Sequence, residues 1–195
     1  MENVTVLFAD ARNLSFPAGT FDIALCGFMG WDDCFDFVNF KFTQPNSKAT
    51  EIYRVLKDDG RFVCCAWEAQ DDLAWMEEAM LRYYPAISQD VEYLTRRPIG
   101  MSYEKAKGYE IILRAAGFKN IEVSREKAEF VSTDEEEWWR QMQYIGWDVF
   151  FEKIRVEDEQ KPQRIREAIL TDLQSYKHLD GIHFTKSVFF VSGEK

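Results

Sequence analysis

Short apolar runs, each of strand length, recur along this chain. They occupy residues 4–8, 21–28, 61–67 and 184–192. The runs are nearly continuous rather than alternating, which is typical of strands that are covered on both faces. Residues 121–131 alternate over several positions instead, so we expect a strand there with one wetter face.

Helical spacing of apolar residues separates these runs. In residues 71–84 they recur three and four positions apart, and Pro85 ends the pattern. The same spacing predicts a helix over residues 104–116, ended by Gly117, and another over residues 163–179.

Capping residues mark two further helices. Asn46 or Ser47 can cap a helix that runs to about residue 57. Residues 133–136, Thr-Asp-Glu-Glu, have the form of a capping box, so a helix is expected to begin there. Residues 35–42 are aromatic and remain ambiguous between a helix and a packed loop.

The order of these elements predicts an α/β fold. The strand over 21–28, the capped helix, a turn over 58–60 and the strand over 61–67 form a βαβ unit, whose crossover is expected to be right-handed. At 195 residues the chain is long enough for one full core and short for two, so we expect a single domain over 1–195.

The charge excludes two classes of partner. The net charge is −10, so the chain has no basic surplus for binding a nucleic-acid backbone or an anionic membrane surface. No apolar run is long enough to cross a bilayer, and the first residues lack the pattern of a signal peptide. We expect a soluble, cytoplasmic protein.

The cysteines and histidines predict neither a disulfide framework nor a metal site. The four cysteines contain no C-x-x-C pair, and we expect buried, reduced thiols. With two histidines in the chain, a zinc site is not expected.

Several motifs, in order, give the chain a family resemblance. Asp10-Ala11 follows the first apolar run, residues 13–22 resemble the connection "LPFPDxSFD", and residues 54–61 resemble the turn "RVLKPGG" with Asp for its Pro and its first Gly. Residues 115–123 and 187–195 resemble the lead into the sixth strand and the last strand of the same family. The chain thus resembles a class I S-adenosylmethionine-dependent methyltransferase of the small-molecule, quinone-biosynthesis-like branch.

The resemblance implies a fold and a cofactor. The fold would be a Rossmann-like three-layer sandwich with an antiparallel C-terminal strand, and the cofactor S-adenosylmethionine. In the family's sheet the strands run three, two, one, four, five, seven, six. The "RVLKPGG" turn is structural in the family, and we expect the retained Gly60 to need a positive φ.

The resemblance also implies site residues. Asp10 would accept the adenine amino group and the backbone N–H of Ala11 would reach a ring nitrogen. Asp10 by itself is better explained as a cap of the turn after its strand, and the matching residues that follow favour the cofactor. Cys26, Gly27 and Phe28 would line the methionine part of the cofactor, or pack as an ordinary strand end.

Residues after the next two strand ends would form the substrate walls. Met29, Trp31 and Trp67, with Glu68, would surround the transferred methyl group, and aromatic faces suit a cationic sulfonium. Core packing is the alternative for both tryptophans. Methyl transfer depends mainly on positioning, so no catalytic residue is assigned.

Two further groups of residues have a plain and a functional interpretation. Arg96 and Arg97 lie where the family often builds a substrate lid and could hold an anionic substrate, but a solvated loop is the preferred interpretation. An aromatic group could roof an apolar pocket or form core: Trp138, Trp139, Tyr144 and Trp147.

The family's first strand and Gly-rich loop are not recognised in this sequence, so the domain is expected to be N-terminally truncated. Without them an apolar sheet edge would be bare. Three outcomes would cover this edge. Residues 4–8 dock beside residues 21–28, or two chains pair or exchange their edge strands as a homodimer, or the natural gene product is longer than this sequence. The function expected is methyl transfer to a small molecule, incomplete in this chain. The alternative is a non-catalytic remnant that serves as a binding or oligomerisation module.

Overall fold

The computed structural model describes residues 3–28, 35–36, 39, 41–44, 47–88 and 105–195. These residues group into two compact units. Unit 1 contains Met1–Glu68, Gly100–Glu126 and Val188–Lys195, and unit 2 contains Ala69–Ile99 and Lys127–Ser187. The expectation of a single domain over 1–195 stays a prediction, and each unit is described by itself.

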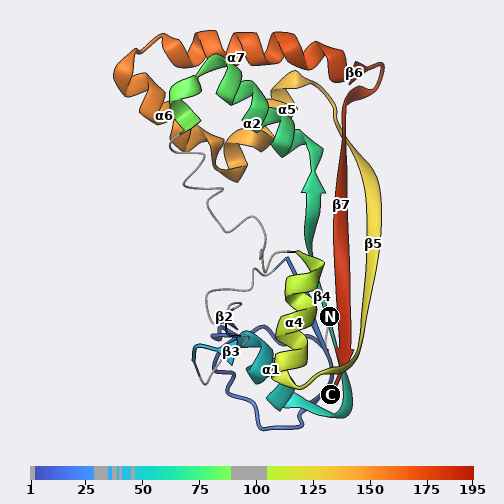
Figure 1. The fold of residues 1–195 in the computed structure, drawn as a ribbon. Helices are drawn as coiled ribbons and strands as arrows, with labels where there is room; N and C mark the ends of the chain where they lie inside the picture. Colours follow the sequence, from blue (N-terminus) through green and yellow to red (C-terminus); the bar gives the residue numbers. More distant parts are fainter. Residues whose placement is uncertain (1–2, 29–34, 37–38, 40, 45–46, 89–104) are drawn as a thin grey trace. The chain divides into compact units, whose positions relative to one another are not determined.

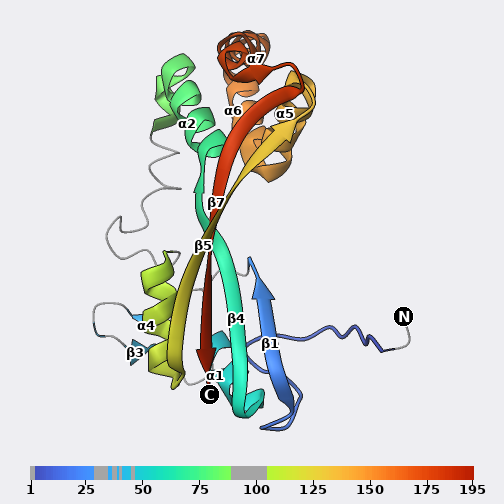
Figure 2. The same ribbon diagram turned by 90° about the vertical axis from the view of Figure 1, so that its right-hand side faces the viewer.

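The sheet of unit 1 has the strand order β1-β4-β7-β5 (Figures 1 and 2). Its strands are β1 Phe21–Gly27, β4 Leu56–Gln70, β7 Gly181–Glu194 and β5 Lys119–Ser132. β1 and β4 are parallel, as the predicted βαβ unit requires. In the numbering of the family that the sequence resembles, this is the order four, five, seven, six, which confirms the expected fold class.

The two helices in the described part of unit 1 pack on the same face of the sheet. α1 Lys48–Val55 and α4 Ala106–Ala116 share one buried cluster with Phe62 of β4 and Phe189 of β7. On the opposite face of β1, Ile23 is 61% exposed and Leu25 is 77% exposed. The prediction that this strand is covered on both faces is therefore wrong, because in the described part of unit 1 the helices cover one side alone.

The predicted cap of α1 is confirmed. The Ser47 hydroxyl accepts a hydrogen bond from the Thr50 N–H at 3.1 Å, and the Thr50 hydroxyl accepts one from the Ser47 N–H at 2.9 Å. This reciprocal pair satisfies two backbone donors at the helix start. The helix ends at Val55, two residues before the predicted end.

The predicted turn over residues 58–60 lies inside β4, and its glycine has a different role from the predicted one. The positive φ falls on Asp59, at 65°, and not on Gly60. A Cβ at Gly60 would lie 2.7 Å from the Lys57 carbonyl oxygen. Gly60 is needed because the backbone approaches closely at that position.

Residues 4–8 do not form the predicted strand. They have no regular secondary structure, and Val6 and Phe8 are 90% and 107% exposed. An apolar run becomes a strand only when a second strand satisfies its backbone groups, and no described strand pairs with it.

Residues 35–42, left ambiguous by the sequence, contain two short strands. β2 Phe35–Asp36 pairs antiparallel with β3 Lys41–Phe42. This pair is a separate two-stranded sheet, so it does not extend the sheet of unit 1.

Unit 2 consists mainly of helices. Its elements are α2 Asp71–Tyr83, η1 Pro85–Ile87, α5 Glu135–Met142, the π-helical turn η2 Gln143–Trp147, α6 Asp148–Glu157, α7 Lys161–Asp172, η3 Leu173–Tyr176 and the short strand β6 Lys177–His178. The predicted helix over 163–179 thus ends earlier. The cap of α5 is Asp134, one residue after the start of the predicted box, and it accepts a hydrogen bond from the Glu137 N–H at 2.7 Å.

The core of unit 2 explains three of the four aromatic residues singled out from the sequence, since Trp147 is partly buried against the cluster that contains Trp138 and Trp139. Trp138 and Trp139 are 1% and 4% exposed and pack with Met76 and Ile169. Tyr144 is 92% exposed instead. The core interpretation therefore holds for the three tryptophans and fails for Tyr144.

Candidate functional site

The carboxyl end of β1 brings together the residues predicted to line the methionine part of the cofactor. Cys26 pairs with Cys64 of β4, and Gly27 pairs with Cys65. The Phe28 N–H then donates to the Cys65 carbonyl oxygen at 3.1 Å. The parallel ladder thus continues to the residue at which the chain leaves the sheet.

Phe28 leaves the strand in a left-handed conformation, with a φ of 52°. This conformation is costly for a residue with a side chain. The Phe28 ring lies 4.6 Å from the Trp67 ring, centroid to centroid, with an angle of 34° between the planes. Two predicted site residues from different strands therefore form one aromatic pair.

This aromatic pair is accessible. Phe28 is 50% exposed and Trp67 is 36% exposed, so Trp67 does not belong to the core of unit 1. Gly27 lies beside the pair, and a Cβ there would meet nothing within 4 Å. The backbone at this strand end is open to close approach by a ligand.

Cys26 differs from its neighbours in orientation. Its side chain is partly buried against the cluster formed by α1, α4 and the sheet. Successive strand residues point to opposite faces. Cys26 could thus contribute to the predicted site through its backbone, while its thiol belongs to the core side.

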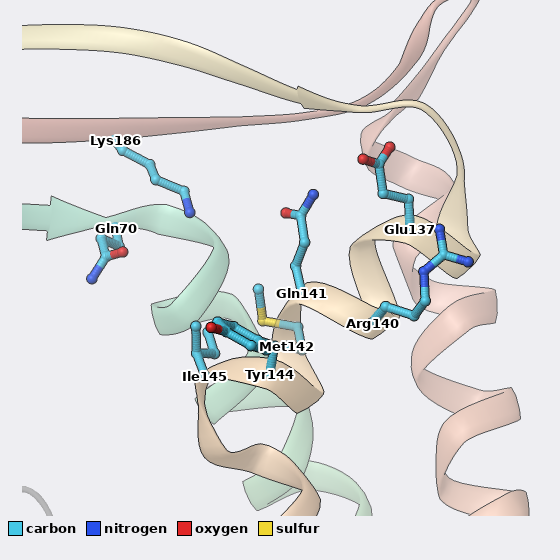
Figure 3. A pocket seen from close by; sticks show the side chains of 8 residues that line it. All are labelled: Gln70, Glu137, Arg140, Gln141, Met142, Tyr144, Ile145 and Lys186. Carbon is cyan, nitrogen blue, oxygen red and sulfur yellow. The ribbon is translucent and has the colours of Figure 1, made fainter. Parts of the chain in front are cut away.

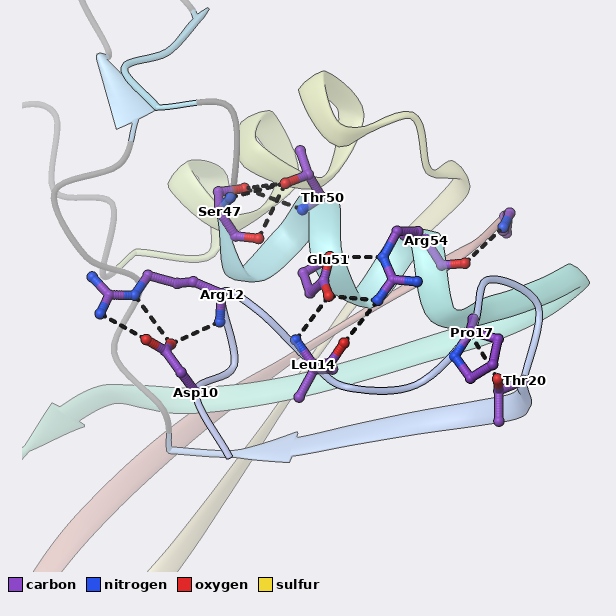
Figure 4. Close-up of polar contacts among 10 residues, drawn as sticks. Asp10, Arg12, Leu14, Pro17, Thr20, Ser47, Thr50, Glu51 and Arg54 are labelled. Carbon is purple, nitrogen blue, oxygen red and sulfur yellow. Dashed lines mark hydrogen bonds and ion pairs between the residues drawn. The ribbon is translucent and has the colours of Figure 1, made fainter. Parts of the chain in front are cut away.

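Asp10 lies in a tight turn that its own side chain stabilises (Figure 4). Its Oδ1 accepts a hydrogen bond from the Arg12 N–H at 2.9 Å, and its Oδ2 pairs with Arg12 Nη2 at 2.9 Å. The hydrogen bonds from Arg12 lower the pKa of Asp10 to about 2. The turn-capping role is therefore real, while the adenine-binding role of Asp10 and of the half-buried Ala11 stays a prediction.

An ion pair on α1 holds the loop that follows this turn, as Figure 4 shows. Glu51 Oε1 accepts a hydrogen bond from the Leu14 N–H at 2.8 Å, and Arg54 Nη2 donates to the Leu14 carbonyl oxygen at 3.0 Å. Arg54 Nη2 lies 2.6 Å from Glu51 Oε1. The Arg54 guanidinium lowers the pKa of Glu51.

The contacts of Glu51 and Arg54 with the main chain of Leu14, called the brace below, were not predicted from the sequence. The motif around Arg54 was interpreted as a fold marker alone, and Glu51 was not considered. The i,i+3 spacing of the two charges was the available signal, because such residues share one side of a helix. The brace fixes the loop between the predicted adenine site and β1.

The remaining predicted residues lie outside the described part of the chain or outside this strand end. Met29, Trp31, Arg96 and Arg97 fall outside the described residues. Glu68, next to Trp67, accepts a hydrogen bond from Arg125 Nε at 2.7 Å on its Oε1. In the described ranges no group of three or more His, Cys, Asp or Glu side chains could hold a metal ion, and no helix has the length and apolarity of a membrane span.

Comparison with known proteins adds a family match and a fold match. Residues 1–64 match the family model described as a methyltransferase domain. No curated protein matches.

Three solved structures are similar to this chain. A proposed type II methyltransferase from Anaeromyxobacter dehalogenans is 14% identical, with a TM-score of 0.50, and the match covers 100% of this chain and 73% of that one. The YcgJ protein of Bacillus subtilis is 15% identical, with a TM-score of 0.46, and the match covers 96% of this chain and 69% of that one. Phosphoethanolamine N-methyltransferase 2 of Haemonchus contortus, solved with S-adenosylhomocysteine, is 18% identical, with a TM-score of 0.37. The match covers 95% of this chain and 36% of that one.

The first of these structures supports the fold, and the family match supports the cofactor. The matched segment contains Asp10, Ala11 and the carboxyl end of β1 with Phe28. The order β1-β4-β7-β5 is the order expected for strands four, five, seven and six. Residues 1–64 therefore match a methyltransferase domain, and the described sheet has the strand order of the Rossmann-like class I methyltransferase fold.

Proposed function

We propose that this chain binds S-adenosylmethionine at the carboxyl end of β1 and takes part in methyl transfer to a small molecule. The observation that carries the proposal is the Phe28–Trp67 pair beside the open backbone of Gly27. A sulfonium is cationic, and the face of an aromatic ring attracts a cation. The exposed pair offers such faces at the strand end predicted to hold the methionine part.

The reaction is a displacement at the methyl carbon. A lone pair on the acceptor forms the new bond to carbon while the carbon–sulfur bond breaks, and its electrons stay on sulfur. S-adenosylhomocysteine leaves, and the acceptor loses a proton to solvent if it carried one. Phe28 and Trp67 would orient the sulfonium and exclude water, which is positioning rather than acid–base chemistry.

Asp10 and Ala11 would receive the adenine edge. Asp10 stays ionised at neutral pH because hydrogen bonds from Arg12 lower its pKa to about 2. A carboxylate has about four acceptor sites, so it can accept the adenine amino group in addition to Arg12. The Ala11 N–H would donate to a ring nitrogen.

Titration calorimetry with S-adenosylhomocysteine tests this proposal. We expect micromolar binding, weakened at least about tenfold in Trp67→Ala. The control is Tyr144→Ala, because Tyr144 is an exposed aromatic residue of unit 2, whereas Trp75 packs against Trp138 and its loss would disturb the core. We expect Tyr144→Ala to leave this affinity unchanged. No binding at millimolar ligand would refute the proposal for this chain and favour a non-catalytic module whose cofactor site is incomplete.

We also propose that the chain forms a homodimer through β1. β1 is the end strand of its sheet, and Ile23 and Leu25 expose their side chains there. Residues 4–8 are apolar, exposed and unpaired with any described strand. Pairing these surfaces between two copies would bury both, and an exposed apolar edge is a template for such pairing. Cys26, Cys64 and Cys65 form no disulfide, which supports the proposal of a reducing, cytoplasmic location.

A further inference from the structure

Unit 2 contains a hollow that the proposed methyl-transfer site does not use. Its volume is about 480 Å³. This size is within the range of small-molecule sites. Figure 3 shows its lining side chains, which come from α5, the π-helical turn η2 and the neighbouring strand β7: Arg140, Gln141, Met142, Tyr144, Ile145 and Lys186 among them.

The apolar wall of this pocket comes from the π-helical turn. Tyr144 is 92% exposed and Ile145 is 51% exposed, whereas Met142 beneath them is 1% exposed. Gly146 follows with a φ of 113°. Turns of the π type are frequent at functional sites, and this one projects two apolar side chains away from the core at the rim of a hollow.

The polar wall is rich in hydrogen-bond donors. Lys186 Nζ is held 2.7 Å from Asp72 Oδ2, and the two side chains are 15% and 3% exposed. An ammonium carries three N–H groups, so it can donate to a ligand as well as to Asp72. The buried carboxylate fixes the position of this cation at the pocket wall.

Gln141 adds a second donor between the two ends of the pocket, as Figure 3 shows. Its Oε1 accepts a hydrogen bond from the Ser132 hydroxyl at 3.3 Å, so its amide oxygen is already used. Glu137 is an acceptor in the lining, but its Oε2 already accepts hydrogen bonds at 2.6 Å from the Thr133 N–H and hydroxyl.

Arg140 makes the wall more cationic. It lines the same pocket as Glu137, whose pKa its charge helps to lower after the larger effect of the hydrogen bonds from Thr133. A guanidinium in this position attracts an anion toward the hollow even where it does not touch it.

We propose that this pocket binds a small organic monocarboxylate with a flat or branched apolar body. The carboxylate accepts hydrogen bonds from Lys186 and Gln141, and the apolar body lies on Tyr144 and Ile145. A hydrogen bond between charged partners is stronger than one between neutral partners, so the carboxylate is preferred to its amide. The site lies entirely within unit 2 and is independent of the cofactor site proposed for unit 1.

Calorimetry with 2-naphthoate and its neutral isostere 2-naphthamide tests the charge preference on the full chain. We expect saturable binding of 2-naphthoate at least about tenfold tighter than that of the amide, unaffected by S-adenosylhomocysteine. Equal affinities, no binding of 2-naphthoate up to about 5 mM, or displacement by S-adenosylhomocysteine would overturn the proposal.

A pair of matched variants tests the location. Gln141→Glu places a negative charge in the pocket, whereas Gln143→Glu makes the same change two residues away, outside this lining. We expect 2-naphthoate affinity to fall at least about tenfold in Gln141→Glu and in Tyr144→Ala, and to stay unchanged in Gln143→Glu. Thermal unfolding verifies that the variants fold, and equal affinity in Gln141→Glu and Gln143→Glu would overturn the assignment.

Discussion

The Phe28 ring lies on the Trp67 ring, with 4.6 Å between centroids, because Phe28 adopts a φ of 52° where β1 ends. Aromatic pairs stabilise beyond their buried area. The pair here is exposed, so its contact offsets only part of the backbone cost. We interpret the left-handed residue as a feature of the binding site rather than of the core.

Two substitutions at Phe28 separate backbone cost from ring function. Phe28→Gly removes the ring and the steric cost of a positive φ, whereas Phe28→Ala removes the ring and keeps that cost. We expect the glycine variant to exceed the alanine variant by about 1 kcal/mol in free energy of unfolding by urea titration. Both variants should lose affinity for S-adenosylhomocysteine, and full affinity in either would contradict the role of the ring.

Alanine substitutions at Gly60 and Gly27 should affect different properties: the first should lower stability and the second should weaken cofactor binding. A Cβ at Gly60 meets the Lys57 carbonyl oxygen at 2.7 Å, so Gly60→Ala should lower the free energy of unfolding by roughly 1–3 kcal/mol. A Cβ at Gly27 meets nothing within 4 Å, so Gly27→Ala should leave stability nearly unchanged. Calorimetry should instead show weaker cofactor binding in Gly27→Ala. A destabilised Gly27→Ala with normal binding would contradict this assignment.

The brace at Glu51 predicts a dependence of stability on acidity. The pKa of Glu51 is lowered, first by its hydrogen bonds with Arg54, so its contribution is present above its usual pKa of about 4.5 and lost as the pH falls through the lower folded value. Glu51→Gln should therefore flatten the acid limb of stability measured by thermal unfolding. Glu122→Gln, an exposed change on β5, is the control. An acid limb identical to that of the unmodified chain would exclude the brace as its cause.

His183 predicts a change at higher pH. Hydrogen bonds with Asp180 and then Glu129 raise its pKa above 6.5, and the neighbouring His178 ring lies 4.4 Å away. Because the pKa of His183 is higher in the folded protein, its protonation stabilises the fold at pH values below about 6.5. This contribution is lost as the pH rises through the pKa of His183 in the folded state. Urea titration at pH 6 and pH 8 should show a smaller difference in His183→Gln than in the unmodified chain. An equal difference in both would contradict this account.

The proposed dimer predicts a mass change on substitution of one exposed residue. Leu25→Asp places a charge on the exposed face of β1, and Val6→Asp places one in the unpaired N-terminal segment. We expect light scattering to give a dimer for the unmodified chain and a monomer for each variant. Val156→Asp changes an 89% exposed residue of unit 2 and should leave the dimer intact. A monomeric unmodified chain would refute the dimer.

The predicted elements that proved correct depend on local signals. β1 and the part of β4 over residues 61–67 coincide with apolar runs, and the caps at Ser47 and Gly117 mark the start of α1 and the end of α4. The predicted strand over residues 4–8 failed because pairing is non-local: the run has the composition of a strand and no described partner.

Details of the site were beyond the sequence for related reasons. The positive φ of Phe28 and of Asp59 falls on residues that ordinarily avoid it, so no residue preference indicated either. The π-helical turn that exposes Tyr144 adds a residue to the helical repeat, which removes the periodicity on which the core interpretation of Tyr144 depended.

The brace on the loop acts on the main chain of Leu14. Glu51 takes its N–H and Arg54 takes its carbonyl oxygen, so the anchoring does not depend on which side chain occupies position 14. The side chain at position 14 can therefore change while the path of the loop at that position stays the same. Substitutions of Glu51 or Arg54, in contrast, would remove a hydrogen bond that holds the loop.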